Sequence, residues 1–269
     1  MKSRLDQLVL LQGFAPTLRQ AQAMIAAGQV LVNDQMADKA GALFTENCEI
    51  RLRGKACPYV SRGGLKLAAG LDHFQLDPTG FICADIGAST GGFTDCLLQR
   101  GAAKVYAIDV GYGQLAWKLR QDPRVMVMER TNARNLKPGD LADPLDLAVI
   151  DASFISLKTL LPPLLVFFPG AIRVLALIKP QFEVGRGQLG TGGVVRDRDL
   201  HEKVIGEIRE FADQLGLVPV GVSPSPILGP KGNREFLIYL VAGIATIQLN
   251  AENAPDHQAV TIQQCPRLW

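Results

Sequence analysis

The sequence lacks the residue patterns of several common protein classes. Its five cysteines are odd in number and form no C-x-x-C pair, so neither a disulfide framework nor a zinc site is predicted. Only three histidines occur, none at metal-ligand spacing from another, and His73 follows an apolar helical pattern typical of a packing or surface residue. We therefore expect a protein of the reducing cytoplasm that holds no metal.

Membrane signals are also missing. The N-terminus has no apolar core followed by a small-residue cleavage site, so no signal peptide is predicted. The most apolar stretch, residues 160–178, contains three prolines and Arg173, and no uninterrupted run approaches the roughly 18 residues that span a bilayer. We interpret this stretch as a helix followed by a buried strand and expect a soluble protein with no membrane partner.

Charge is distributed unevenly along a chain whose formal net charge is only +2. Residues 1–66 carry nine Lys/Arg and five Asp/Glu, a net of +4, so the remainder sums to −2. Within this part, residues 51–66 hold five basic residues and no acid. The asymmetry indicates a polyanionic partner or, alternatively, a solvated basic face.

The first sixty residues are expected to form a small α+β domain. Residues 3–13 predict a helix capped by Ser3 and ended by Gly13, and a second helix begins after Pro16-Thr17 and closes at Gly28. A strand that turns at Asn33-Asp34 and a short strand at residues 48–53 follow. Residues 54–64 have the composition of a linker, and we place the domain at residues 1–60.

Residues 61–243 alternate between helical patterns and apolar strands, which is typical of a mostly parallel α/β sheet. Five strands are predicted after the first one at residues 81–86: residues 104–109, 125–128, 145–151, 173–179 and 217–222. The last strand, residues 235–241, follows too closely for a helical crossover, so an antiparallel hairpin edge is expected. Residues 244–269 are polar and aperiodic and are predicted to be a loose tail.

A glycine-rich turn, D-I-G-A-S-T-G-G-F at residues 85–93, joins the first strand to a helix. Ligands bind at this place in open α/β sheets, beyond the carboxyl end of a strand. Gly87 permits close backbone approach, while Gly91 and Gly92 let the helix present free N–H groups. Asp85 is placed to pair with an ammonium group. Neither G-x-G-x-x-G nor G-x-x-x-x-G-K-[ST] occurs, so a dinucleotide or triphosphate is not indicated.

A carboxylate ends the next strand about twenty residues further on. Asp109 is placed to accept both hydroxyls of a ribose. A tight turn without a ligand is the alternative. The glycine turn, the apolar strand before it and Asp109 together favour a ligand site.

This turn resembles the D-x-G-x-x-P-G-G-F turn of the FtsJ-like RNA 2′-O-methyltransferases, with Thr90 in place of the usual proline. The resemblance implies a Rossmann-like methyltransferase sheet and S-adenosylmethionine as cofactor, with S-adenosylhomocysteine as product. Asn132 stands where that family often uses an acid to read adenine. The cofactor residues implied are Asp85, Gly87, Ser89, Gly91, Gly92, Phe93, Asp109 and Asn132.

Four charged residues stand at strand or helix ends: Lys66, Asp151, Lys179 and Glu235. Ribose methylation needs a base or a cation that lowers the pKa of the hydroxyl, and a partly desolvated lysine supplies either. The four match the Lys-Asp-Lys-Glu tetrad of the FtsJ-like enzymes. That resemblance implies that Lys179 lies nearest the reacting hydroxyl, that the two acids orient the lysines, and that Lys66 steadies the ribose.

Residues 3–33 resemble the alpha-L RNA-binding motif of a small-subunit ribosomal protein and of pseudouridine synthases. The motif implies that Arg4, Arg19 and Gln20 face RNA, and the basic run adds Arg62. Together with V-S-R-G-G-L-K-L and the tetrad, residues 1–243 resemble the TlyA family, although K-A-C-P-Y-V replaces the R-A-W-V linker often found there.

The family resemblance implies 2′-O-methylation of cytidine in ribosomal RNA, with ribosomal RNA or ribosomal subunits as partners. Two alternatives stay open. The family carries a haemolysin label, which would make this a membrane-lysing protein. Against direct lysis, the chain has no basic amphipathic helix of useful length. An RNA-binding protein with an inactive methyltransferase fold is the other alternative, against which the complete tetrad weighs.

Overall fold

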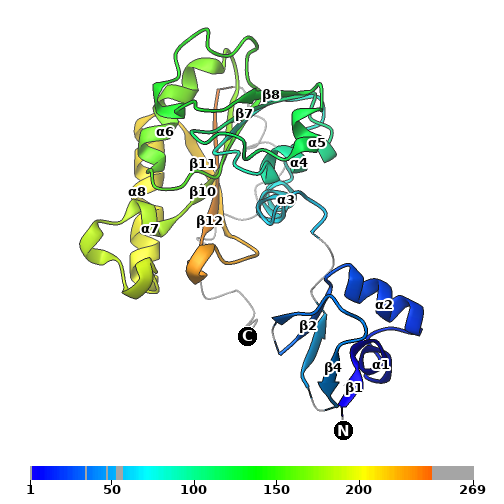
Figure 1. The fold of residues 1–269 in the computed structure, drawn as a ribbon. Coiled ribbons are helices and arrows are strands. Elements are labelled where there is room, and N and C mark those ends of the chain that lie inside the picture. Colours follow the sequence, from blue (N-terminus) through cyan, green and yellow to red (C-terminus); the bar gives the residue numbers. More distant parts are fainter. Residues whose placement is uncertain (1, 34, 47, 53–56, 244–269) are drawn as a thin grey trace. The chain divides into compact units, whose positions relative to one another are not determined.

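The computed structural model describes residues 2–33, 35–46, 48–52 and 57–243 (Figure 1). It divides into two compact units, Met1–Pro58 and Tyr59–Trp269, a division two residues before the expected boundary. The tail predicted at residues 244–269 and residues 53–56 of the basic run, which hold two of its five basic residues, lie outside the described residues. Each unit has its own hydrophobic core.

The N-terminal unit packs two helices on two small sheets. Its helices are α1 (Leu5–Leu11) and α2 (Leu18–Ala26). Antiparallel β1 (Lys2–Arg4) pairs with β4 (Leu43–Thr45), and β2 (Val30–Val32) lies between β3 (Gln35–Met36) and β5 (Ile50–Leu52). Leu5, Val9, Ile25 and Val30 are fully buried between these elements.

Two local predictions in this unit have different outcomes. Helix α2 begins directly after Thr17, as predicted, and the Thr17 side chain caps it by accepting a hydrogen bond from the Gln20 amide at 3.2 Å. Ser3 does not cap α1: it lies within β1 opposite Phe44, and its hydroxyl donates to Glu46. Arg4 is the N-cap residue and the helix begins at Leu5, one residue later than a Ser3 cap predicts, because the long-range strand pairing extends to Arg4.

The C-terminal unit contains the predicted mostly parallel sheet, with strand order β11-β12-β10-β9-β6-β7-β8. The strands are β6 (Ile82–Ile86), β7 (Lys104–Ile108), β8 (Val125–Met128), β9 (Leu147–Ile150), β10 (Ile172–Ile178), β11 (Val218–Pro224) and β12 (Phe236–Ala242). The helices are α3 (Gly63–His73), α4 (Gly92–Gln99), α5 (Trp117–Arg120), α6 (Leu157–Leu164), α7 (Pro180–Glu183) and α8 (Arg198–Gln214). Single 3₁₀ turns are η1 (Ala133–Asn135), η2 (Leu165–Phe167), η3 (Arg186–Gln188), η4 (Thr191–Gly193) and η5 (Pro230–Gly232).

The last strand is antiparallel, as predicted, but it is not an edge strand. β12 pairs with β10 on one side and with β11 on the other, so β11 forms the edge. The sequences explain the order. β12 is buried over six of its seven residues, whereas β11 contains Pro219 and Pro224, which cannot donate ladder hydrogen bonds, and has an irregular register at Pro219/Gly221.

Helices cover both faces of this sheet. Helices α6 and α8 lie on one face, where Ile86, Ile108 and Ile150 form part of the core, and α3, α4 and α5 lie on the other (Figure 1). Residues 160–178 form a helix followed by a buried strand, as predicted. Among the described helices, none is long and apolar enough to cross a membrane. The parallel strands all end at one edge of the sheet, and the candidate site lies there.

Candidate active site

The glycine turn follows β6 and leads into α4. Asp85, the penultimate residue of β6, is fully buried, and its Oδ2 accepts hydrogen bonds from the Thr94 amide (2.8 Å) and the Thr94 hydroxyl (2.7 Å). Its other oxygen, Oδ1, is buried without a protein hydrogen-bond partner in the described part of the chain. Burial raises the pKa of Asp85 to about 7, against the opposing effect of the Thr94 hydrogen bonds.

Three glycines of the turn are required by close packing. Gly87, at φ +85°, lies against the backbone that follows β9: a Cβ there would come within 3.0 Å of the Asp151 carbonyl. Gly91 has φ +96°, and a Cβ there would lie 2.2 Å from a Leu119 methyl. At Gly92 a Cβ would lie 2.2 Å from the Ser61 hydroxyl. The close backbone approach expected at Gly87 is thus with the segment after β9, and Gly92 admits the segment before α3.

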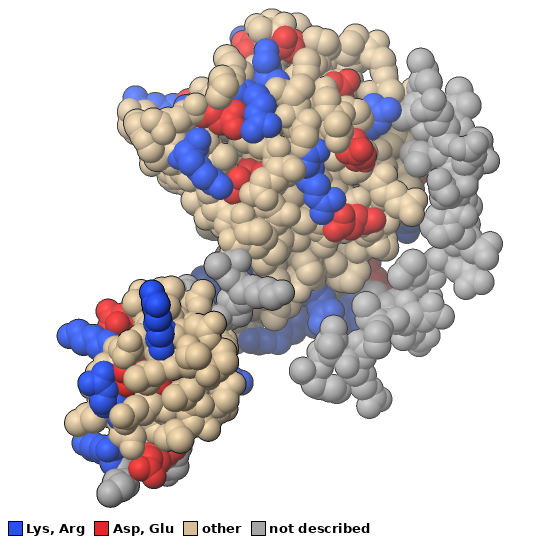
Figure 2. Space-filling view, turned by 90° about the vertical axis from the view of Figure 1, so that its right-hand side faces the viewer, with Lys and Arg blue, Asp and Glu red and all other residues tan. Residues whose placement is uncertain are grey.

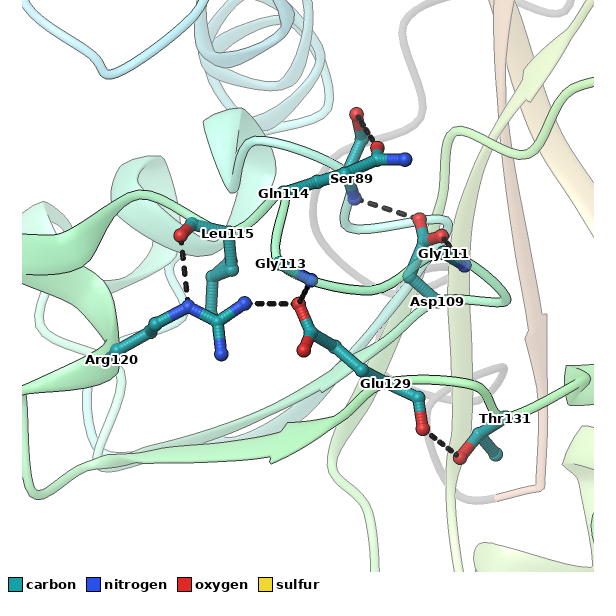
Figure 3. Close-up of polar contacts among 9 residues, drawn as sticks. All are labelled: Ser89, Asp109, Gly111, Gly113, Gln114, Leu115, Arg120, Glu129 and Thr131. Atoms are coloured by element: carbon teal, nitrogen blue, oxygen red, sulfur yellow. Dashed lines mark hydrogen bonds and ion pairs between the residues drawn. The ribbon is translucent and has the colours of Figure 1, made fainter.

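Asp109 follows β7 directly and binds backbone amides on two sides. Its Oδ2 accepts from the Ser89 amide at 2.8 Å and its Oδ1 from the Gly111 amide at 2.6 Å (Figure 3). The Ser89 hydroxyl donates to Gln114 at 3.3 Å. The glycine turn is therefore fixed to the loop after β7, and Asp109 as a residue is partly exposed.

The remaining two cofactor candidates lie in different surroundings. Asn132 follows β8 and is half-buried, and its side-chain oxygen accepts from the Arg134 amide at 3.2 Å, capping η1. Phe93 is 2% exposed and belongs to the hydrophobic core on the α3–α4 face. The structure places Phe93 as a packing residue that holds α4 on the sheet.

The charged tetrad forms two ion pairs. Lys66 on α3 places its Nζ 2.6 Å from Glu235 Oε2, and both side chains are at most 9% exposed. Lys179, directly after β10, places its Nζ 2.5 Å from Asp151 Oδ1. The Lys179 ammonium also donates to the Asp151 carbonyl (3.2 Å) and the Ser153 hydroxyl (3.0 Å).

Strand register places these pairs at one edge of the sheet. Ile178 of β10 is opposite Phe236 of β12, so Lys179 and Glu235 are the next opposed residues. The first turn of α3 meets the second pair, because a Cβ on Gly63 would lie 3.6 Å from Asp151 Oδ2. Gly87 adjoins the Asp151 backbone. The glycine turn and the tetrad therefore meet at Asp151.

Sequence analysis missed three neighbours of the tetrad. Ser153 bonds Lys179, as described above. Phe154 is 90% exposed in a left-handed conformation (φ +64°), with its ring 4.9 Å from that of Phe182. Gln181, on α7, has a buried side-chain oxygen without a protein hydrogen-bond partner in the described segments. An exposed aromatic beside a buried charged cluster has no pattern in the sequence by which it could have been found.

The four RNA-binding candidates are all exposed, but one of them also has a structural partner. Arg19, Gln20 and Arg62 are exposed, with Gln20 accepting from the Thr17 hydroxyl. Arg4, whose side chain is 49% exposed, also forms a two-point ion pair with the fully buried Asp6, at 2.7 and 3.0 Å. This guanidinium lowers the pKa of Asp6 to about 2. Figure 2 shows basic side chains over the surface of the N-terminal unit, interspersed with acidic ones.

Metal ligands and reactive thiols are not gathered at this site. Throughout the described residues, no group of three or more His, Cys, Asp or Glu side chains has the arrangement of a metal site. Cys83 and Cys96 are buried in the core, and burial raises the pKa of the Cys96 thiol to about 11. His73 is exposed at the end of α3.

With this geometry in place, comparison with known proteins identifies the family. The FtsJ-like methyltransferase model matches residues 59–242, and the S4 domain model matches residues 3–50. The chain belongs to the TlyA family of FtsJ-like methyltransferases. Its S4 domain corresponds to the RNA-binding motif expected from the sequence, and the predicted methyltransferase fold is confirmed.

Relatives resemble the chain over most of its length. "Putative rRNA methyltransferase YqxC" of Bacillus subtilis is 47% identical over 89% of this chain and 85% of its own. The 16S/23S rRNA (cytidine-2′-O)-methyltransferase TlyA of Mycobacterium tuberculosis is 45% identical over 89% of this chain and 90% of its own. A solved structure titled "Putative hemolysin from Streptococcus thermophilus" is 46% identical, with a TM-score of 0.71, over 90% of this chain and 89% of that one.

Proposed function

We propose that this protein transfers a methyl group from S-adenosylmethionine to the 2′-hydroxyl of cytidine in ribosomal RNA. The observation that carries the proposal is the junction at Asp151, where the glycine turn adjoins the two buried lysine–acid pairs. The identity and coverage of the rRNA methyltransferase relatives support the substrate. Action on ribosomal RNA would place the protein in the cytoplasm.

The residues around the glycine turn fit S-adenosylmethionine. Asp85 Oδ1 is a buried oxygen that needs a donor, and an ammonium group supplies one. Asp109 keeps lone pairs for ribose hydroxyls after binding two amides, and the Asn132 amide group is suited to read the adenine edge. Gly87 and Ser89 shape the turn between them. When bound, the cofactor supplies an activated methyl group on a sulfonium.

The tetrad acts on the acceptor hydroxyl. Lys179, 7% exposed and paired with Asp151, is the cation that we place next to the 2′-oxygen. An ammonium that donates to this oxygen lowers the pKa of the hydroxyl and stabilises negative charge on the oxygen as the hydroxyl proton passes to solvent. Asp151 and Ser153 fix the direction of the Lys179 Nζ. Lys66, held by Glu235, would steady the ribose.

Exposed groups around this junction would hold the RNA. Phe154, the residue after Ser153 in the chain, is 90% exposed, and stacking on aromatic rings is a common way of holding an unpaired base. Arg62 lies at the start of α3, one residue before Gly63, and is exposed for a phosphate contact. Arg19 and Gln20 are the equivalent exposed candidates on the S4 domain.

The test is methyl transfer from labelled S-adenosylmethionine to ribosomal subunits and to free ribosomal RNA, with mass spectrometry of the nucleosides. We expect label in 2′-O-methylcytidine. Label on a base instead of a ribose, or no transfer to either substrate, would contradict the proposal. The haemolysin name of the Streptococcus relative calls for liposome leakage in parallel, and leakage without transfer would favour a membrane-active protein.

A further inference from the structure

The loop that carries Asp109 is fixed by a charged residue outside the proposed site. This residue lies on the side of the loop that faces away from the glycine turn. This loop, residues 109–116, joins β7 to α5 and contains two glycines, of which Gly113 has φ +72°. Such a loop has much backbone freedom unless other groups fix it. Figure 3 shows Glu129, the residue directly after β8, pointing into the curve of the loop.

Glu129 bonds the loop and a neighbouring arginine with the same oxygen. Its Oε1 accepts from the Gly113 amide at 2.8 Å and forms an ion pair with the Arg120 guanidinium. Arg120 Nε donates in turn to the Leu115 carbonyl at 3.1 Å. The Glu129 side chain is 11% exposed and that of Arg120 is 23% exposed. These two side chains thus fix an amide and a carbonyl of the loop from one side.

Backbone hydrogen bonds join the same segment to the base of the loop. The Arg130 amide donates to the Gly111 carbonyl at 3.0 Å, and the Thr131 amide donates to the Asp109 carbonyl at 2.9 Å. The Thr131 hydroxyl bonds the Glu129 carbonyl at 3.1 Å. Movement of Glu129 would therefore reach Asp109 through the loop.

The side of the loop opposite Glu129 faces the glycine turn. Ser89 donates its amide to Asp109 and its hydroxyl to Gln114, so loop and turn form one hydrogen-bonded unit. The Glu129 carboxylate contacts neither Ser89 nor Asp109 directly. It supports the cofactor side of the site from the opposite side of the loop.

We propose that Glu129, together with Arg120, is a positioning residue for S-adenosylmethionine: it fixes the loop so that the Asp109 carboxylate is held ready for the cofactor ribose. The inference rests on the proposed function. Neither residue belongs to a motif recognised in the sequence. Arg120 lowers the pKa of Glu129, so the carboxylate stays ionised at neutral pH and the support does not switch there.

The experiment compares full-length protein with Glu129→Ala, Glu129→Gln and Arg120→Lys. Dissociation constants for S-adenosylmethionine and S-adenosylhomocysteine come from calorimetry, and kcat and KM from transfer to ribosomal RNA. An unfixed loop must be ordered on binding, so we expect Glu129→Ala to raise both dissociation constants and the cofactor KM about tenfold. At saturating cofactor, kcat should stay within about threefold, because the tetrad is untouched.

The conservative variants should raise the dissociation constants less than Glu129→Ala does. Glu129→Gln keeps an oxygen for the Gly113 amide but loses the ion pair, so a rise of about threefold is expected. Arg120→Lys keeps the charge but cannot donate to both Glu129 and the Leu115 carbonyl in the guanidinium's geometry, and should behave similarly. Asp122→Asn is the matched control, since Asp122 pairs with Arg124 at 2.7 Å between α5 and β8 without touching the loop.

The outcomes separate the inference from the proposed function. Unchanged cofactor affinity in folded Glu129→Ala, or a fall in kcat with unchanged KM, would overturn the inference alone. An equal loss of affinity in Asp122→Asn would also overturn it, because any ion pair in this region would then suffice. Absence of cofactor binding by the unsubstituted protein would overturn the proposed function and, with it, this inference. Thermal unfolding of each variant verifies the fold.

Discussion

The two halves of the candidate site are held together by different kinds of interaction. On the glycine-turn side, carboxylates bind backbone amides: Asp85 binds Thr94, Asp109 binds Ser89 and Gly111. On the tetrad side, buried side chains pair with each other, lysine with acid. The first half is a shaped backbone that suits the binding of one fixed small molecule. The second half concentrates buried charge, which suits the chemistry that we propose on the acceptor hydroxyl.

This difference predicts separable effects. Changes on the glycine-turn side should act mainly on cofactor affinity, whereas changes in the tetrad should act on the transfer rate and on stability. Burial strengthens the second expectation, because a buried charge that loses its partner is far more costly than an exposed one.

The largest effect is expected from breaking the Lys66–Glu235 pair. Lys66→Met leaves Glu235, 0% exposed at its side chain, without its cation, and should lower the free energy of unfolding by about 3–5 kcal/mol. The double variant Lys66→Met/Glu235→Leu removes both charges and should recover most of the stability while transfer stays lost. Urea denaturation and transfer assays measure the two effects.

A matched control for this prediction exists on the same sheet. Lys104→Met breaks the Lys104–Asp143 pair, whose side chains are 34% and 29% exposed, and should cost less, about 1 kcal/mol or below. Equal losses for Lys66→Met and Lys104→Met would remove the role that we assign to burial. Recovery of transfer in the double variant would show that the charges are not needed for the reaction.

A smaller effect is expected from Asp85 and should depend on pH. Its pKa of about 7 is raised by burial, so the carboxyl is protonated below that pH and ionised above it. An ammonium group binds the ionised form, so cofactor affinity should increase as pH rises through about 7, with release of a proton on binding. Asp85→Asn should weaken affinity about tenfold at pH 8 and abolish this pH dependence.

Stability without cofactor should change in the opposite direction. Because the folded pKa lies above the unfolded value near 4, the contribution of Asp85 to stability is present at low pH and is lost as pH rises to about 7. For cofactor binding, calorimetry in buffers of different ionisation enthalpy detects the proton that Asp85 releases. A pH-independent affinity in the unsubstituted protein would disprove the pairing of Asp85 with an ammonium group.

The smallest effect is expected in the S4 domain, where two arginines differ. Arg19 is exposed, so Arg19→Ala should weaken RNA binding about threefold and reduce the slope of log affinity against log salt by about one. Arg4 holds the buried Asp6, so Arg4→Ala should lower the thermal stability of this domain. RNA binding over a salt series and thermal unfolding distinguish the two variants. Loss of stability in Arg19→Ala, with loss of RNA affinity in a stable Arg4→Ala, would contradict the roles assigned to the two arginines.

Much of the fold and of the site follows from local sequence patterns. The glycine turn, the strand-end acids and the start of α2 after Thr17 depend on neighbouring residues, so the sequence predicts their places. What it could not predict depends on pairing over long distances. The interior place of β12, the β1–β4 pair that displaces Ser3, and the partners within the tetrad all join segments far apart in the chain.

Phe93 and Glu129 illustrate the same limit within the site. The burial of Phe93 in the core depends on the packing of α4 on the sheet, and its role toward the cofactor stays a prediction. Glu129 directly follows an ordinary apolar strand, and only the fold of the loop after β7 brings the Gly113 amide to its carboxylate. Residues that act through another residue leave no local pattern in the sequence.

The most direct test of the central claim is a paired measurement on Lys179→Ala, with cofactor affinity and single-turnover methyl transfer determined on the same sample. We predict that transfer falls by roughly 10²–10⁴-fold, the range typical of a lost acid–base group, while the dissociation constant of S-adenosylmethionine changes less than about twofold. Transfer at the unsubstituted rate, or loss of cofactor binding in the folded variant, would contradict the division of the site into a cofactor half and an acceptor half.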